Sequence, residues 1–141
     1  MEKEDREKDR EKRAQEKVIE FSMLEQENKK LEQQLQSIDQ QILLFDELKI
    51  NLSKISKHKG EFLSSLGPGV FMKSKLLDNK KFLINVGTGI VVEKEHQEAE
   101  KIIDQQIKKL KEARNSVEGV ITKNFNAMIK IEGELKELVK K

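Results

Sequence analysis

The sequence predicts a mainly α-helical chain with a small β insert, in which a long antiparallel two-helix coiled coil is joined by two β-hairpins. Apolar residues recur at alternating steps of three and four on both flanks of the chain, which is typical of a coiled coil. The helix breakers gather in the middle, since the single proline is Pro68 and five of the seven glycines lie between Gly60 and Gly89. We expect one domain, made of a charged tail (1–13), a first helix (14–59), a hairpin segment (60–93) and a second helix (94–141).

The first helix is expected to carry a heptad seam in which only Asn28 and Lys49 are polar. The seam consists of Phe21, Leu24, Asn28, Leu31, Leu35, Ile38, Ile42, Phe45, Lys49 and Leu52. Gly60 follows as a stop signal. Residues 2–13, in front of the seam, are all charged. They either extend the helix through i,i+4 pairs such as Glu2 with Arg6 or are disordered.

The hairpin segment is expected to hold four short strands. Two Gly-x-Gly corners, at 67–69 and 87–89, are each followed by a hydrophobic strand, and 78–80 is a turn signal between them. Unpaired strand edges invite pairing with other chains, so we expect these hairpins to assemble with other chains into a multi-subunit barrel or sheet. The apolar residues expected to drive this assembly are Val70, Phe71, Met72, Leu76, Phe82, Ile84, Val86, Ile90 and Val92.

The second helix repeats the pattern of the first. Its seam is Ile103, Ile107, Leu110, Arg114, Val117, Ile121, Asn124, Met128, Ile131, Leu135 and Leu138. Because the segments 14–57 and 95–138 have equal length, they are expected to pair antiparallel, with facing residue numbers that sum to 152. This register sets Asn28 against Asn124, and a buried Asn pair favours one register at a cost in stability.

Near the end of the coil that carries the chain termini, apolar residues also occur off the seam, where two helices cannot cover them all. With neighbouring seam residues they form a candidate binding surface for hydrophobic parts of other proteins. The residues of this surface are Val18, Ile19, Phe21, Met23, Leu24, Met128, Ile129, Ile131, Leu135 and Val139. The alternative is that the off-seam residues pack against a frayed helix end or another subunit.

Composition and motifs argue against several other functions. Cysteine is absent, which removes disulfides, thiolate metal ligands and thiol nucleophiles. Lys and Arg (28) nearly balance Asp and Glu (26), so no nucleic-acid partner is expected. The Gly-x-Gly corners do not continue into a nucleotide-binding motif, and neither His58 nor His96 has a patterned metal or nucleophile partner. No apolar run has the length of a transmembrane span. We expect a cytoplasmic protein that is no enzyme and has no metal, cofactor or membrane contact.

The stretches LGPGVFMKSK (66–75) and VGTGIVVEK (86–94) resemble the two hairpin motifs of the prefoldin family, specifically its archaeal alpha-type subunits. The resemblance implies a hexamer of two alpha and four beta-type subunits, with β-barrels in its body and six coiled-coil arms. It further implies an ATP-independent chaperone that holds unfolded proteins at its arm tips and delivers them to a group II chaperonin. The alternative is a structural coiled-coil scaffold or filament former without client transfer. The chain departs from the family pattern at Pro68 and Glu95.

Overall fold

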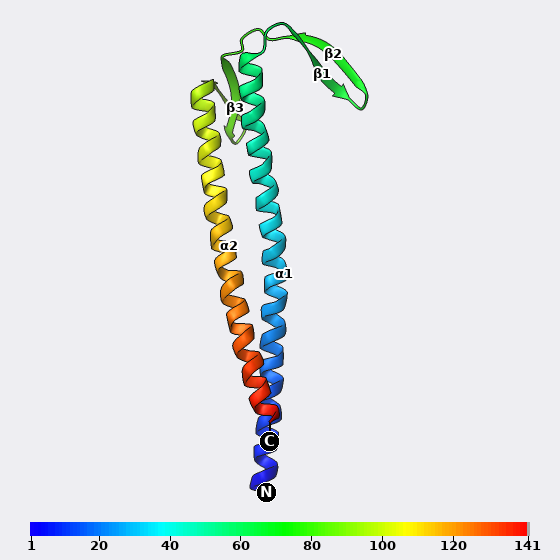
Figure 1. Cartoon of the computed structure of the whole chain (residues 1–141), viewed down its shortest axis with the longest axis vertical. Helices are drawn as coiled ribbons and strands as arrows, with labels where there is room; N and C mark the ends of the chain where they lie inside the picture. Colours follow the sequence, from blue (N-terminus) through cyan, green and yellow to red (C-terminus); the bar gives the residue numbers. More distant parts are fainter. Residues whose placement is uncertain (141) are drawn as a thin grey trace. The chain divides into compact units, whose positions relative to one another are not determined.

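A computed structural model, which describes residues 1–140, contains two long helices and two β-hairpins (Figure 1). The elements are α1 (Glu2–Lys57), β1 (Glu61–Gly67), β2 (Val70–Lys75), β3 (Lys81–Gly87), β4 (Ile90–Glu95) and α2 (His96–Val139). The predicted mainly α-helical fold with a small β insert is confirmed. The chain divides into two compact units. We call them the terminal unit, formed by Met1–Gln40 and the chain from Lys111 onward, and the hairpin unit, Gln41–Leu110.

The first helix is longer at its start than the segment 14–59 expected from the seam. It begins at Glu2, so the charged residues 2–13 are helical and not a separate tail. Acidic residues in the first turn (Glu2, Glu4 and Asp5) favour this start, because they face the positive end of the helix dipole. Alternating charges at i,i+4 then support the following turns.

The inner ends of both helices are set by the hairpin segment. Helix α1 ends at Lys57, shortly before Gly60, whose φ of 93° is incompatible with continuing the helix. Helix α2 begins at His96 and not at residue 94, because β4 runs to Glu95. Lys141, expected at the end of the second helix, lies outside the described residues.

The seam of each helix is turned away from solvent. Every seam residue of α1 from Phe21 to Leu52 is buried or half-buried, and the residues between them are exposed. The seam residues of α2 from Ile103 to Leu138 are likewise buried or half-buried, with Ile131 only 5% exposed, and three residues beside this seam, Glu118, Ala127 and Glu134, are half-buried too. Removal of these apolar stripes from water is the main force that holds α1 and α2 together.

The two hairpins have the same internal pairing. Strand β1 pairs antiparallel with β2, and β3 pairs antiparallel with β4. The pair Glu61 and Lys75 in the first hairpin corresponds to Lys81 and Glu95 in the second. Both ladders are interrupted by a bulge at the equivalent place, just before the turn. The internal repeat seen in the sequence is therefore also a repeat of structure.

The turns of the two hairpins differ in type. Thr88 and Gly89 both have positive φ, 47° and 75°, which is the type I′ pattern that suits the twist of a hairpin. In the first hairpin Gly69 has a φ of 72°, whereas the ring of Pro68 holds its own φ near about −65°. This combination is typical of a type II turn. The two Gly-x-Gly corners of this chain, one with Pro68 and one with Thr88 at the centre, therefore form different turns.

Within the hairpin unit, β3 lies against both helices. Four consecutive residues of β3, Phe82 to Asn85, line a groove of about 310 Å³ together with residues of α1 and α2 that include Leu52 and Ile103. Ala99, which also lines this groove, is fully buried. Exposure alternates along the second hairpin, since Phe82, Ile84 and Val92 are half-buried whereas Leu83 and Val91 are exposed.

Candidate functional site

The structure brings Asn28 of α1 and Asn124 of α2 together in the terminal unit. The side-chain amide of Asn124 donates to Oδ1 of Asn28 over 2.9 Å, and that of Asn28 donates to the carbonyl of Ile121 over 3.4 Å. Both Asn side chains are buried. Because 28 and 124 sum to 152, this contact agrees with the register expected from the sequence. A shift of register would leave buried amides without partners, so the pair favours this alignment of the helices.

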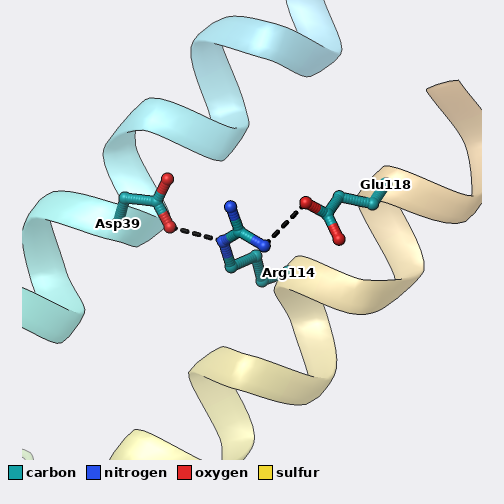
Figure 2. A network of polar contacts seen from close by, with 3 residues as sticks. All are labelled: Asp39, Arg114 and Glu118. Carbon is teal, nitrogen blue, oxygen red and sulfur yellow. Dashed lines mark hydrogen bonds and ion pairs between the residues drawn. The ribbon is translucent and has the colours of Figure 1, made fainter.

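The two basic seam residues, Arg114 and Lys49, direct their charges to carboxylates beside the seam. Arg114 donates from Nε to Asp39 and from Nη1 to Glu118, each over 2.6 Å (Figure 2). Nζ of Lys49 lies 2.6 Å from Asp104. The hydrogen bond to Asp39 raises the pKa of Arg114, and that to Asp104 raises the pKa of Lys49. The aliphatic stems can thus cover the seam while the charged groups stay near water.

A third ion pair, between Lys17 and Glu134, connects the helices nearer the chain termini. The hydrogen bond from Lys17 lowers the pKa of Glu134. A carboxyl whose pKa is lower in the folded chain adds stability above its unfolded pKa, and this stability is lost as the pH falls through the folded value. Both side chains are partly exposed, so solvent screening keeps the effect small.

The start of α1 and the end of α2 lie at the same end of the terminal unit (Figure 1), and we call this end the tip. Several apolar side chains are exposed at the tip. Half of the predicted binding residues are exposed by 54–78%: Val18, Ile19, Met23, Ile129 and Val139. The other half are buried or half-buried seam residues: Phe21, Leu24, Met128, Ile131 and Leu135. The predicted set therefore divides into an outer surface and the contact between the helices. Phe125, exposed by 46%, adds to the outer surface.

The exposed tip residues form short stripes at helical spacing. Ile19 and Met23 are four residues apart on α1, as are Phe125 and Ile129 on α2, so the members of each pair are neighbours on the helix surface. A shallow groove of about 470 Å³ runs along the end of α2, where Val139 lies among Lys and Glu side chains. Apolar stripes interrupted by charges offer contact to many apolar segments without selecting one shape.

The predicted assembly residues of the hairpins also divide by exposure. Those exposed by 53–59% are Val70, Phe71, Met72, Val86 and Ile90. Those that are half-buried are Leu76, Phe82, Ile84 and Val92. Sequence reasoning missed four further apolar residues, exposed by 54–76%: Leu63, Leu66, Leu83 and Val91. The equivalence of the stretches Glu-Phe-Leu (61–63) and Lys-Phe-Leu (81–83) is the signal that could have found two of them.

Sequence reasoning also missed four exposed apolar residues of α1 within the hairpin unit. They are Leu43, Leu44, Leu48 and Ile50, exposed by 42–64%. Among residues 1–140, no group of three His, Cys, Asp or Glu side chains is placed to hold a metal ion. In the same part of the chain, no helix is long and apolar enough to cross a membrane.

Comparison with known proteins identifies the family. A sequence model described as prefoldin subunit matches residues 24–141, most of the chain. The chain belongs to the prefoldin family. This is a chaperone family whose subunits assemble with one another, and the resemblance drawn from the two hairpin motifs is thereby confirmed.

The relatives of this prefoldin chain are alpha subunits. It is 28% identical over 130 residues to prefoldin subunit alpha of Archaeoglobus fulgidus, a match that covers 89% of this chain and 93% of that protein. It is 32% identical to prefoldin subunit alpha of Pyrococcus horikoshii over 71 residues, 50% of this chain and 48% of that protein. The predicted alpha type is confirmed.

A solved structure has the same fold. The chain superimposes on a filamentous PFD from Methanocaldococcus jannaschii, solved by cryo-electron microscopy, with a TM-score of 0.55 and 21% sequence identity. The match covers 88% of this chain and 98% of that one. At this identity the likeness establishes the arrangement of helices and strands and not a shared assembly.

Proposed function

We propose that this chain is an ATP-independent chaperone subunit whose tip holds unfolded proteins by apolar contact. One observation carries the proposal: the tip of a coil in a chaperone family exposes Val18, Ile19, Met23, Ile129 and Val139. Soluble proteins rarely leave such a group of apolar side chains in water without a partner. Flexible Met beside branched aliphatic side chains adapts to partners of different shape.

The proposed working form is a hexamer of two copies of this chain and four beta-type subunits. The similarity to alpha subunits and the exposed apolar residues of the hairpins support this assembly. In it, the hairpins join those of the other subunits in β-barrels, which removes their unpaired edges from water. A client then touches several tips at once, and weak contacts combine into useful affinity. A group II chaperonin is the proposed recipient of the client.

The tip assignment is tested by replacing Val18, Ile19, Met23, Ile129 and Val139 together with Ser. The full-length variant is assembled with a beta-type subunit, and light scattering follows aggregation of a chemically denatured client without nucleotide. We expect the amount of complex needed for protection to rise at least about tenfold, because the main apolar anchors are gone. Native mass spectrometry should show an unchanged hexamer, since all five side chains are exposed.

A matched control replaces Leu43, Leu44 and Ile50, exposed apolar residues of α1 in the hairpin unit, with Ser. This variant loses exposed apolar side chains of the same kind, at three positions away from the tip, and is expected to keep its protection. Unchanged protection by the intact hexamer of the tip variant would contradict the proposed role of the tip. The delivery step is checked separately, by the yield of refolded client after addition of a group II chaperonin and ATP.

A further inference from the structure

Basic residues gather in the hairpin unit between the end of α1 and the start of β3. Residues 57–81 contain six of the 28 Lys and Arg residues of the chain but only two of its 26 Asp and Glu residues. The remainder of the chain is therefore net acidic, although the whole chain has a net charge of +2. A local excess of positive charge attracts anions.

Three Lys of this segment line one hollow of about 580 Å³. Each comes from a different piece of the chain: Lys59 follows α1, Lys75 ends β2, and Lys80 precedes β3. All three side chains are exposed. The fold thus brings three ammonium groups that are separated in the sequence to a single concave surface.

The three Lys of the hollow are not neutralised by carboxylates. Among residues 1–140, none of them takes part in an ion pair. Asp78, the one acidic residue of the lining, accepts the backbone N–H of Lys80 over 2.8 Å and so stabilises the turn. Glu61 pairs with Lys75 across the first hairpin but does not line the hollow. An anion bound there would relieve the repulsion between the ammonium groups.

The wall of the hollow is held by side-chain contacts. Nε2 of His58 donates to the carbonyl of Glu61 over 3.0 Å, and the ring of His58 meets the ring of Phe62 edge-on. The side-chain amide of Asn79 donates to the carbonyl of Ser56 over 3.1 Å, which ties the segment before β3 to the end of α1. A wall that is formed before the ligand arrives lowers the entropic cost of binding.

We propose that this hollow binds an oligophosphate anion through Lys59, Lys75 and Lys80. Ammonium groups are compact point charges that suit phosphate oxygens, whereas the planar fork of Arg is the better match for a carboxylate. The hairpin unit contains no Arg. The inference goes beyond the proposed function, since it concerns a small anion bound in the hairpin unit and does not depend on client binding at the tip.

The lining of the hollow offers little to a nucleobase. It contains no Phe, Tyr or Trp, and its one aromatic ring, that of His58, already contacts Phe62. Proteins that bind single-stranded nucleic acids stack the bases on such rings. Recognition should therefore stop at the phosphates, so that inorganic triphosphate and the triphosphate group of a nucleotide bind with similar strength.

The proposal is tested by isothermal titration calorimetry with inorganic triphosphate, in magnesium-free buffer of fixed ionic strength. The full-length chain is assembled with a beta-type subunit. We expect a dissociation constant of about 1 mM or tighter. Lys59→Gln, Lys75→Gln and Lys80→Gln should each weaken binding at least about threefold, and the triple variant at least about twentyfold, because each change removes one charged contact to phosphate.

The matched control replaces Lys101, Lys108 and Lys109, exposed residues of α2 in the hairpin unit, with Gln. It removes the same charge from the same unit and should change the dissociation constant by less than about twofold. ATP should bind within about threefold of inorganic triphosphate, and AMP at least about tenfold more weakly, because AMP carries a single phosphate. Circular dichroism should show wild-type helix content in every variant.

Several outcomes would overturn the proposal. They are the absence of binding at about 1 mM triphosphate, unchanged binding by the triple variant, and an equal loss of binding in the control. Binding of ATP or of a single-stranded oligonucleotide at least about tenfold more tightly than triphosphate would also overturn it, since the base would then be recognised. Because client protection is measured separately, failure here leaves the role of the tip standing.

Discussion

The tip and the hairpins both expose apolar side chains, but their backbones make different demands. At the tip the side chains project from α1 and α2, whose backbone groups are already bonded within each helix. In the hairpins they project from two-stranded sheets, and each sheet has two edges with unpaired backbone groups. Contact at the tip therefore needs only apolar area, whereas contact at the hairpins also needs a strand or face in a defined register.

This difference teaches how one chain can combine variable binding with specific assembly. A helical surface with scattered apolar residues tolerates many partners, because no hydrogen bond is lost when the partner slides. A hairpin with unpaired edges and charges at fixed ladder positions rewards one alignment and penalises others. Variable contact suits the terminal unit, and defined contact suits the hairpin unit.

The largest effect is expected from a charge placed in the seam at the tip. Ile131 is 5% exposed and Ile129 is 66% exposed, two residues apart on α2. Ile131→Asp buries a carboxylate without a partner and should lower the free energy of unfolding by about 3 kcal/mol or more. Ile129→Asp should change it by less than about 0.5 kcal/mol. Equal destabilisation in thermal denaturation followed by circular dichroism would contradict the division of the tip into seam and outer surface.

An intermediate effect is expected at the Asn layer of the terminal unit. Asn28→Ala leaves the buried amide of Asn124 without its acceptor and should cost about 1–3 kcal/mol in denaturant unfolding. The double change Asn28→Leu with Asn124→Leu should instead stabilise the coil but loosen its register. Cysteines at positions 24 and 128 report this register, since they should crosslink in the parent coil. In the double variant, crosslinking between positions 31 and 128 should also appear. Its absence would show that other contacts hold the register.

The smallest effects are expected when one glycine in each unit is replaced by alanine. A Cβ added at Gly133 in α2 or at Gly89 in the second turn meets nothing within 4 Å, so neither substitution creates a clash with neighbouring atoms. Gly133→Ala should stabilise the chain by about 0.5–1 kcal/mol through helix propensity. Gly89→Ala should destabilise its hairpin by about 1 kcal/mol, because φ is 75° there. Hydrogen exchange of helix and hairpin amides measures both. A shift of the same sign at both sites would refute this distinction.

The helices and strands could be predicted from the sequence wherever a single local pattern dominated. The period of the seam predicted every buried or half-buried residue between Phe21 and Leu52, because a coiled coil buries whatever recurs at that spacing. The state of residues 2–13 could not be predicted, because solvation of the charges competes with i,i+4 pairing at nearly equal energy. The structure has these residues in α1.

The strands of the hairpins show where local pattern was insufficient. Alternation assigns Phe82 and Leu83 to opposite faces of β3, but both are apolar, so alternation alone cannot tell which face is covered. In the structure Phe82 is half-buried, whereas Leu83 is exposed by 76%. Leu63 was missed for the same reason.

By itself, the sequence determined the two helices, the two hairpins, the Asn28 and Asn124 layer and the family, because these depend on spacing and on short motifs that act locally. The tertiary structure alone decided which apolar residues stay in water, as the difference between Phe82 and Leu83 shows. Exposure is a property of what packs against a side chain, and those neighbours come from distant parts of the chain.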